Sequence, residues 1–137
     1  MVKTYIEYID HAMFPCYIGF TSNKKKFEKE MARLGVSKSE LETSEGSDAT
    51  TWTLIKDGKF TIIVQSDGSR KPYSSEIVGL VAHESAHVLD GILKAMKEDV
   101  TDAGPEMRAY TVQWLVQSFL AIYDREHKER KKRAKKK

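Results

Sequence analysis

The apolar and polar positions of the first forty residues predict a strand region followed by two helices. Residues 1–20 are rich in aromatic and β-branched side chains, which indicates one or two strands. Residues 24–34 carry apolar side chains three or four positions apart, so they predict an amphipathic helix that ends at Gly35. Ser37 and Glu40 have the spacing of a capping box, and a short helix can begin there.

The middle of the chain predicts a β-hairpin and then a long helix. Residues 51–68 are enriched in Thr, Trp, Ile, Phe and Val, and the Asp-Gly pair at 57–58 is a strong signal for a tight turn between two strands. Either Ser74 or Ser75 can cap the helix that follows. We expect this helix to run to about Glu98, with one apolar stripe.

A final helix is predicted to start at Pro105, because the missing N–H of proline has no intrahelical partner in the first turn. Residues 109–123 are apolar on most sides of this helix, so we expect it to be largely buried. The order strand, helix, hairpin, helix, helix predicts a single α+β domain over residues 1–124. Residues 125–137 are predicted to form a basic, disordered C-terminal tail.

The charge is distributed unevenly between these two parts. Residues 125–137 carry nine Lys/Arg against two Glu, whereas residues 1–124 carry fourteen against eighteen acidic residues. The tail therefore has a balance of +7 and the body a balance of −4. A mildly acidic body argues against a nucleic-acid-binding face on it, while clustered cations allow weak, salt-sensitive nucleic-acid contact through the tail.

The composition excludes several classes of protein. The 137 residues suit one domain with one core. No stretch approaches the roughly 18 apolar residues that a membrane span needs, and the N-terminal segment lacks the apolar run of a secretory signal. The single cysteine, Cys16, excludes an internal disulfide framework. We therefore expect a cytoplasmic protein with no membrane contact.

The long predicted helix carries an H-E-x-x-H sequence at residues 83–87. Residues four apart lie one above the other on a helix face, so His83 and His87 can converge on one ion. Zinc binds imidazole nitrogen at about 2.0–2.1 Å and lowers the pKa of a coordinated water towards about 7. Glu84 lies between the two histidines, where its carboxylate can act as the general base that deprotonates this water.

A zinc site of this kind needs a third protein ligand. Glu106 follows His87 by nineteen residues and lies in the first turn of the predicted final helix, so it is our candidate. The helix N-terminal dipole alone also explains an acidic residue at that position. Three other carboxylates are alternatives to Glu106: Asp90, Asp99 and Asp102. His11 and Cys16 are weaker candidates, because they lie in the strand region without fixed geometry. His127 is also weaker, because it lies among charged residues.

The chain resembles the gluzincins over roughly residues 50–123, and the resemblance rests on His83, Glu84, His87 and Glu106. It is most similar to the small single-domain minigluzincins and to small H-E-x-x-H proteins encoded in phage genomes. The resemblance implies a zinc metallopeptidase and a small zincin-like domain. In such a domain a short antiparallel sheet packs on the active-site helix and on a following glutamate helix. It also implies that an edge strand lines the cleft and pairs with the substrate backbone, for which Phe60 to Gln65 is the candidate.

Neighbouring families fit the sequence less well. Metzincins place a glycine three residues and a histidine six residues after the second histidine, where this chain has Asp90 and Leu93. Leu93 also excludes the aspartate ligand of aspzincins. Larger gluzincins often have an aspartate four residues after the glutamate ligand, where this chain has Tyr110. Tyr110 is a candidate to orient a ligand or to stabilise the oxyanion of a tetrahedral intermediate, and it can equally be a packing aromatic.

Three classes of function remain open from the sequence. The first is a zinc-dependent peptidase acting on a peptide or protein substrate, and the intact Glu84 favours it. The second is a zinc-binding zincin-like fold that serves as a binding or inhibitory module. The third is a small nucleic-acid-associated factor that uses its basic tail and whose histidines are structural.

Overall fold

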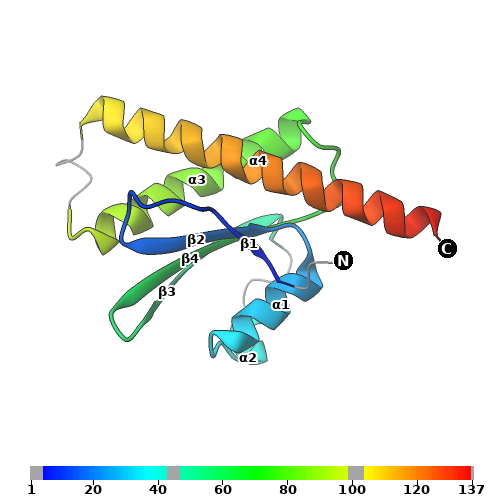
Figure 1. Ribbon diagram of the computed structural model, residues 1–137, viewed down its shortest axis with the longest axis horizontal. Helices are drawn as coiled ribbons and strands as arrows, with labels where there is room; N and C mark the ends of the chain where they lie inside the picture. Colours follow the sequence, from blue (N-terminus) through cyan, green and yellow to red (C-terminus); the bar gives the residue numbers. More distant parts are fainter. Residues whose placement is uncertain (1–4, 43–46, 99–103, 137) are drawn as a thin grey trace.

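The computed structural model describes residues 5–42, 47–98 and 104–136, which form a four-stranded sheet with helices on both faces (Figure 1). The strands are β1 (Glu7–Tyr8), β2 (Cys16–Thr21), β3 (Ala49–Lys56) and β4 (Lys59–Ser66), in the order β1-β2-β4-β3. β2 and β4 are parallel, and the other two pairs are antiparallel. The α+β class is thus confirmed, but the expected antiparallel sheet is mixed, because two helices and β3 separate β2 from β4 along the chain.

The hairpin between β3 and β4 has the predicted turn. Asp57 and Gly58 have φ values of 53° and 76°, and Lys56 and Lys59 are paired in the strand register. Two successive residues with positive φ are the signature of a type I′ turn, whose twist matches that of the flanking strands. The turn therefore fixes the register between β3 and β4.

The helices are α1 (Lys24–Arg33), α2 (Lys38–Glu42), α3 (Ser75–Ala95) and α4 (Pro105–Lys135). Figure 1 shows α3 and α4 covering one face of the sheet and α1 and α2 lying on the opposite side. The Ser74 side chain accepts a hydrogen bond from the backbone N–H of Ile77, so Ser74 rather than Ser75 caps α3. α3 ends at Ala95, three residues before the predicted end.

Strand β4 supplies the core on both of its faces. Ile62 and Val64 are fully buried in the cluster that joins the sheet to α3 and α4, where Phe20 of β2 stacks on Phe119 of α4 at 5.2 Å. Ile63, between them, is fully buried in a second cluster with residues of α1. Successive side chains of a strand point to opposite faces, so one central strand holds both helical layers to the sheet.

Two expectations for the last helix differ from the structure. Only one stripe of α4 is buried, so the helix is not enclosed on most sides; the buried residues are Thr111, Leu115, Phe119, Ile122, Tyr123 and Glu126. The same helix continues to Lys135, so residues 125–135 are helical where a disordered tail was expected. None of the helices in the described ranges is long and apolar enough to cross a membrane.

Polar contacts to the body explain why α4 continues. The buried carboxylate of Glu126 accepts hydrogen bonds from Thr21 Oγ1 at 2.7 Å, from Ser22 N at 2.7 Å and from Ser22 Oγ at 3.0 Å. One turn later, Arg130 donates to Ser22 Oγ and to the carbonyl oxygen of Gly68. Ser22 and Gly68 lie 108 and 62 residues from Arg130 in sequence, so composition alone does not reveal these contacts.

We predict that Glu126→Ala lowers the free energy of unfolding by about 3 kcal/mol, because it leaves a buried hydroxyl and a buried N–H without their acceptor. Glu129→Ala is the matched control, since it removes only the partly exposed ion pair with Lys26 and should cost less than about 1 kcal/mol. Urea unfolding followed by circular dichroism measures both. Equal effects would show that the Glu126 contacts do not hold this part of α4.

Candidate metal centre

The two histidines of the H-E-x-x-H sequence lie side by side in the middle of α3. Both side chains are exposed, and their Nε2 atoms are 3.3 Å apart. The ring centroids are 5.0 Å apart and the ring planes are inclined by 70°. The helix thus brings one nitrogen of each ring to a common point, as the four-residue spacing predicts.

The separation of the two nitrogens fits a shared ion. Two nitrogens bound at about 2.05 Å to a tetrahedral zinc ion lie about 3.3 Å from each other. A direct hydrogen bond between two neutral imidazoles is the alternative, but N–H donors are usually about 2.9–3.0 Å from their acceptors. The 3.3 Å between His83 Nε2 and His87 Nε2 therefore agrees with two corners of a zinc coordination sphere and also with a long hydrogen bond.

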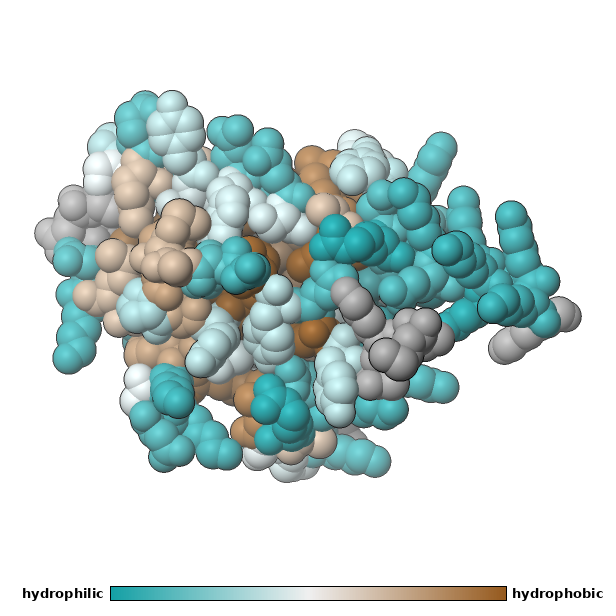
Figure 2. Space-filling model, in the orientation of Figure 1, coloured by the Kyte–Doolittle hydropathy of each residue, from teal (hydrophilic) through white to brown (hydrophobic). Residues whose placement is uncertain are grey.

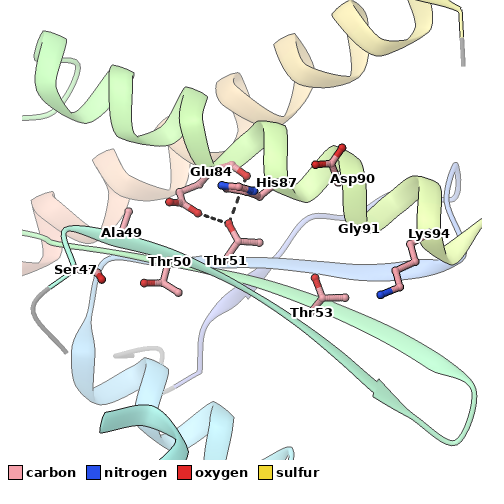
Figure 3. A pocket seen from close by; sticks show the side chains of 10 residues that line it. All are labelled: Ser47, Ala49, Thr50, Thr51, Thr53, Glu84, His87, Asp90, Gly91 and Lys94. Carbon is pink, nitrogen blue, oxygen red and sulfur yellow. Dashed lines mark hydrogen bonds between the residues drawn. The ribbon is translucent and has the colours of Figure 1, made fainter. Parts of the chain in front are cut away.

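Glu84 is oriented by the sheet. Its side chain is 6% exposed, and its Oε2 accepts a hydrogen bond from the hydroxyl of Thr51 on β3. The same hydroxyl lies 3.4 Å from the backbone carbonyl oxygen of Glu84. Figure 3 shows the carboxyl group pointing from α3 towards β3. A hydroxyl that donates to a carboxylate holds it in one rotamer, so Thr51 fixes the direction of the candidate base.

A groove runs between α3 and β3 past these residues. One hollow of this groove has a volume of about 520 Å³ and is lined by Thr51 and Thr53 from β3 and by Glu84, His87 and Gly91 from α3 (Figure 3). It continues towards the start of α3 in a second hollow that His83 and Glu84 line. We call this feature the α3–β3 groove. The histidine pair and the candidate base therefore lie along one groove.

Small side chains set the dimensions of the groove. A Cβ atom at Gly91 would lie 2.9 Å from Ile62 Cδ1 and 3.3 Å from Thr53 Oγ1. Gly91 therefore lets α3 approach the sheet closely at one end of the groove. The residues of β3 that line the groove are Ala49, Thr50, Thr51 and Thr53, and none is large enough to fill the space.

The edge strand of the groove is β3. β4 is paired on both sides, by β2 and by β3, so the prediction that Phe60 to Gln65 forms the edge strand is wrong. β3 is the last strand of the sheet, and no strand within the described ranges pairs with its outer edge. The error arises because the hairpin signal is symmetric: it identifies two paired strands but not which of them lies at the edge.

Glu106 and Tyr110 are not brought to the histidine pair. Both are exposed on the first turns of α4, with Tyr110 65% exposed. Within the described part of the chain, no third His, Cys, Asp or Glu completes a group that could hold a metal ion. Trp114, one turn beyond Tyr110 on α4, contacts the rings of His11 and Phe14.

The other candidate ligands are distributed over the molecule. Asp90 lines the α3–β3 groove beside His87, whereas Asp99 and Asp102 lie outside the described residues. Cys16 is buried in the core, and its burial raises the pKa of the thiol to about 11, which suits a packed side chain rather than a ligand. The two remaining candidates are histidines that contact aromatic rings. His11 lies against Phe14 and Trp114, and His127 stacks on Tyr123.

Sequence reasoning missed Thr51. Its hydrogen bond to Glu84 joins elements thirty-three residues apart, so no local spacing reveals it. The available signal was the alternation in the hairpin, where Thr51 and Thr53 share one face of the strand and Trp52 points to the other. A strand face built from threonines is unusually polar for the side of a sheet that a helix covers.

Comparisons of the chain with protein-family models, with curated proteins and with solved structures find no match.

We predict that the protein binds about one zinc ion per chain and that His83→Ala and His87→Ala each abolish stoichiometric binding. His11→Ala is the control, since His11 lies among aromatic rings away from the pair. Elemental analysis of protein purified without added metal, followed by a zinc titration, measures the content. Full zinc retention in both variants would show that the histidine pair is not the metal site.

Proposed function

We propose that this protein is a zinc-dependent peptidase whose metal ligands include His83 and His87 and whose general base is Glu84. One observation carries the proposal: two imidazole nitrogens at the spacing of zinc ligands lie in the same groove as a buried, oriented carboxylate. A helix with two histidines that have only a structural role needs no carboxylate fixed beside them. A hydrolase needs both groups together.

The side chains of the groove have separate tasks in this proposal. When bound, zinc supplies a Lewis acid that polarises a peptide carbonyl and acidifies water. Glu84 takes the proton from the attacking water and passes it to the departing amine. Thr51 keeps the carboxylate of Glu84 aimed into the groove, so that little reorganisation is needed when the proton moves.

The shape of the α3–β3 groove supports an extended substrate. Among the described residues no strand pairs with the outer edge of β3, so its backbone N–H and C=O groups can pair with another strand. A peptide that adds to this edge gains main-chain hydrogen bonds without a deep pocket. Such a substrate would pass Thr51 and Thr53 on its way along α3, with its backbone beside Glu84 and His87. Peptide-bond hydrolysis is therefore the reaction that suits the groove best.

Glu106 stays our proposal for the third ligand, by the gluzincin resemblance. It is exposed on the first turn of α4, so the proposal includes a movement of that turn towards the histidine pair when zinc binds. Asp90 is the rival carboxylate, because it lies one helical turn beyond His87 and lines the same groove. The two residues belong to different helices, and removing each in turn separates them.

We predict that Glu106→Ala weakens zinc binding at least tenfold, because two histidines alone leave most of the coordination sphere to water. Asp90→Ala should change the zinc affinity by less than about threefold, as expected for a surface charge near a cation. Zinc titrations of the two variants beside the wild-type protein give the affinities. The reverse order would assign the third ligand to Asp90 and place the whole site on α3.

A second candidate function is a zinc-binding module without hydrolysis. The observation in its favour is the exposure of Glu106 and Tyr110, which leaves the described site with two metal ligands and without an oxyanion donor from α4. Such a module would hold a peptide along β3 without cutting it. Zinc content combined with hydrolysis distinguishes the two functions.

We predict that Glu84→Gln lowers the rate of peptide hydrolysis at least about a hundredfold, because glutamine keeps the shape but accepts no proton. Zinc content and melting temperature should stay close to those of the wild type. Asp90→Asn serves as the control, since it removes a carboxylate from the same groove but not from the base position. Mass spectrometry of a random peptide mixture incubated with each protein measures cleavage.

Two results would contradict this assignment in different ways. Cleavage by Glu84→Gln at the wild-type rate would show that Glu84 is not the base. A wild-type protein that holds stoichiometric zinc but leaves the peptide mixture uncut would favour the non-hydrolytic module.

A further inference from the structure

The end of α4 and the start of α1 come together in a basic surface that the candidate metal centre does not use. Lys26 Nζ lies 3.3 Å from Glu129 Oε2, and Arg130 donates to the hydroxyl of Ser22, which precedes α1. These contacts join segments more than a hundred residues apart in sequence. Lys24 and Lys25 are exposed on the first turn of α1, next to this junction.

The last turns of α4 carry a cluster of exposed cations. Residues 131–136 are all exposed, and Figure 2 shows hydrophilic residues gathered over this end of the molecule. Two acidic residues nearby are already paired, Asp124 with Lys128 and Glu129 with Lys26. Within the described ranges no carboxylate forms an ion pair with any of five cations, which we call the basic helix end: Lys131, Lys132, Arg133, Lys135 and Lys136.

The basic helix end is held rigidly up to the point where it leaves the body. Arg130, the last residue before it, donates to Ser22 Oγ at 3.0 Å and to the Gly68 carbonyl at 3.1 Å, and its guanidinium lies 5.7 Å from the centre of the Tyr123 ring. Beyond this anchor the helix projects from the domain (Figure 1). Positive charges fixed on a projecting helix lose little entropy when they meet a polyanion.

The distribution of side chains selects the kind of polyanion. Ala134 is the only apolar residue among residues 128–136, so this part of the helix has no apolar face for insertion into a lipid surface. At about 100° per residue, its five cations cover roughly 200° of the helix circumference, so they can reach phosphates on both walls of a groove that the helix enters. The major groove of B-DNA, about 12 Å wide, admits one α-helix with phosphates on both sides. The major groove of A-form RNA is too narrow for side chains to enter.

We propose that the basic helix end, with the start of α1 beside it, binds duplex DNA without sequence preference. Phosphates on both sides of the major groove contact the five cations, and Lys24 and Lys25 lie close to the adjacent backbone. The body carries a net negative charge, so it turns away from the duplex and the α3–β3 groove stays open. This DNA-binding surface is independent of the proposed peptidase activity.

The salt dependence of binding follows from the number of cations. Each phosphate neutralised releases condensed counterions, and the logarithm of the affinity falls with the logarithm of salt concentration at about −0.9 per contact. Five contacts give a slope of about −4.5. We expect binding to be measurable at about 50 mM salt and weak at about 200 mM.

Fluorescence anisotropy with a labelled duplex DNA of about 20 base pairs tests the proposal on the full chain. Lys132→Glu/Lys135→Glu should weaken binding at least tenfold and reduce the salt slope by about 2, because two phosphate contacts are lost. The control Lys56→Glu/Lys59→Glu makes the same change in net charge at the exposed β3–β4 turn. It should leave the affinity within about threefold of the wild type. Unchanged zinc content and circular dichroism show that each variant is folded.

Several outcomes would overturn the proposal. Equal loss of affinity in the two double variants would show that DNA binding depends on the net charge of the protein and not on the basic helix end. An absence of binding at 50 mM salt would remove the surface as a DNA site. Binding of the same duplex as RNA, or of vesicles with 30% phosphatidylserine, as tight as that of the DNA would assign it to another polyanion.

Discussion

The fold depends on strand β4 being buried on both faces. Ile62 and Val64 hold α3 and α4 on one side, and Ile63 holds α1 on the other. Because β4 pairs with β2 in parallel and with β3 through a tight hairpin, it also leaves β3 at the edge. The position of α3 over the sheet then decides the site. Its apolar stripe faces β4, so the residues at its flank, His83, Glu84 and His87, face the edge strand.

The sequence predicts well those features that depend on nearby residues. Asp57-Gly58, Ser74 and Pro105 mark a turn and two helix starts through local chemistry, and each lies where expected. The convergence of His83 and His87 is likewise a property of one helix. In contrast, the parallel pairing of β2 with β4 joins strands about forty-four residues apart, and no local pattern specifies it. The same limit hid the hydrogen bond between Thr51 and Glu84, and it made the edge strand ambiguous.

The misjudged tail has a different cause. Residues 125–135 are highly charged, and charge normally predicts disorder because such a segment cannot bury apolar surface. α4 is held there by polar groups instead: the carboxylate of Glu126 and the guanidinium of Arg130 find hydroxyl, N–H and carbonyl partners at the ends of β2 and β4. Hydrogen-bond partners of this kind are set by the tertiary structure. The composition gives the number of charged residues but not the groups with which they form hydrogen bonds.

The continuity of α4 has a mechanical consequence. Its 31 residues form one rod of about 46 Å, with Glu106 at one end and the basic helix end at the other. Its middle is held in the core by Leu115 and Phe119. A stiff rod that tilts about a packed centre moves its two ends in opposite directions. Any tilt that carries Glu106 towards the histidines would therefore draw Glu126 and Arg130 away from Thr21 and Ser22, so the two ends of α4 are mechanically coupled.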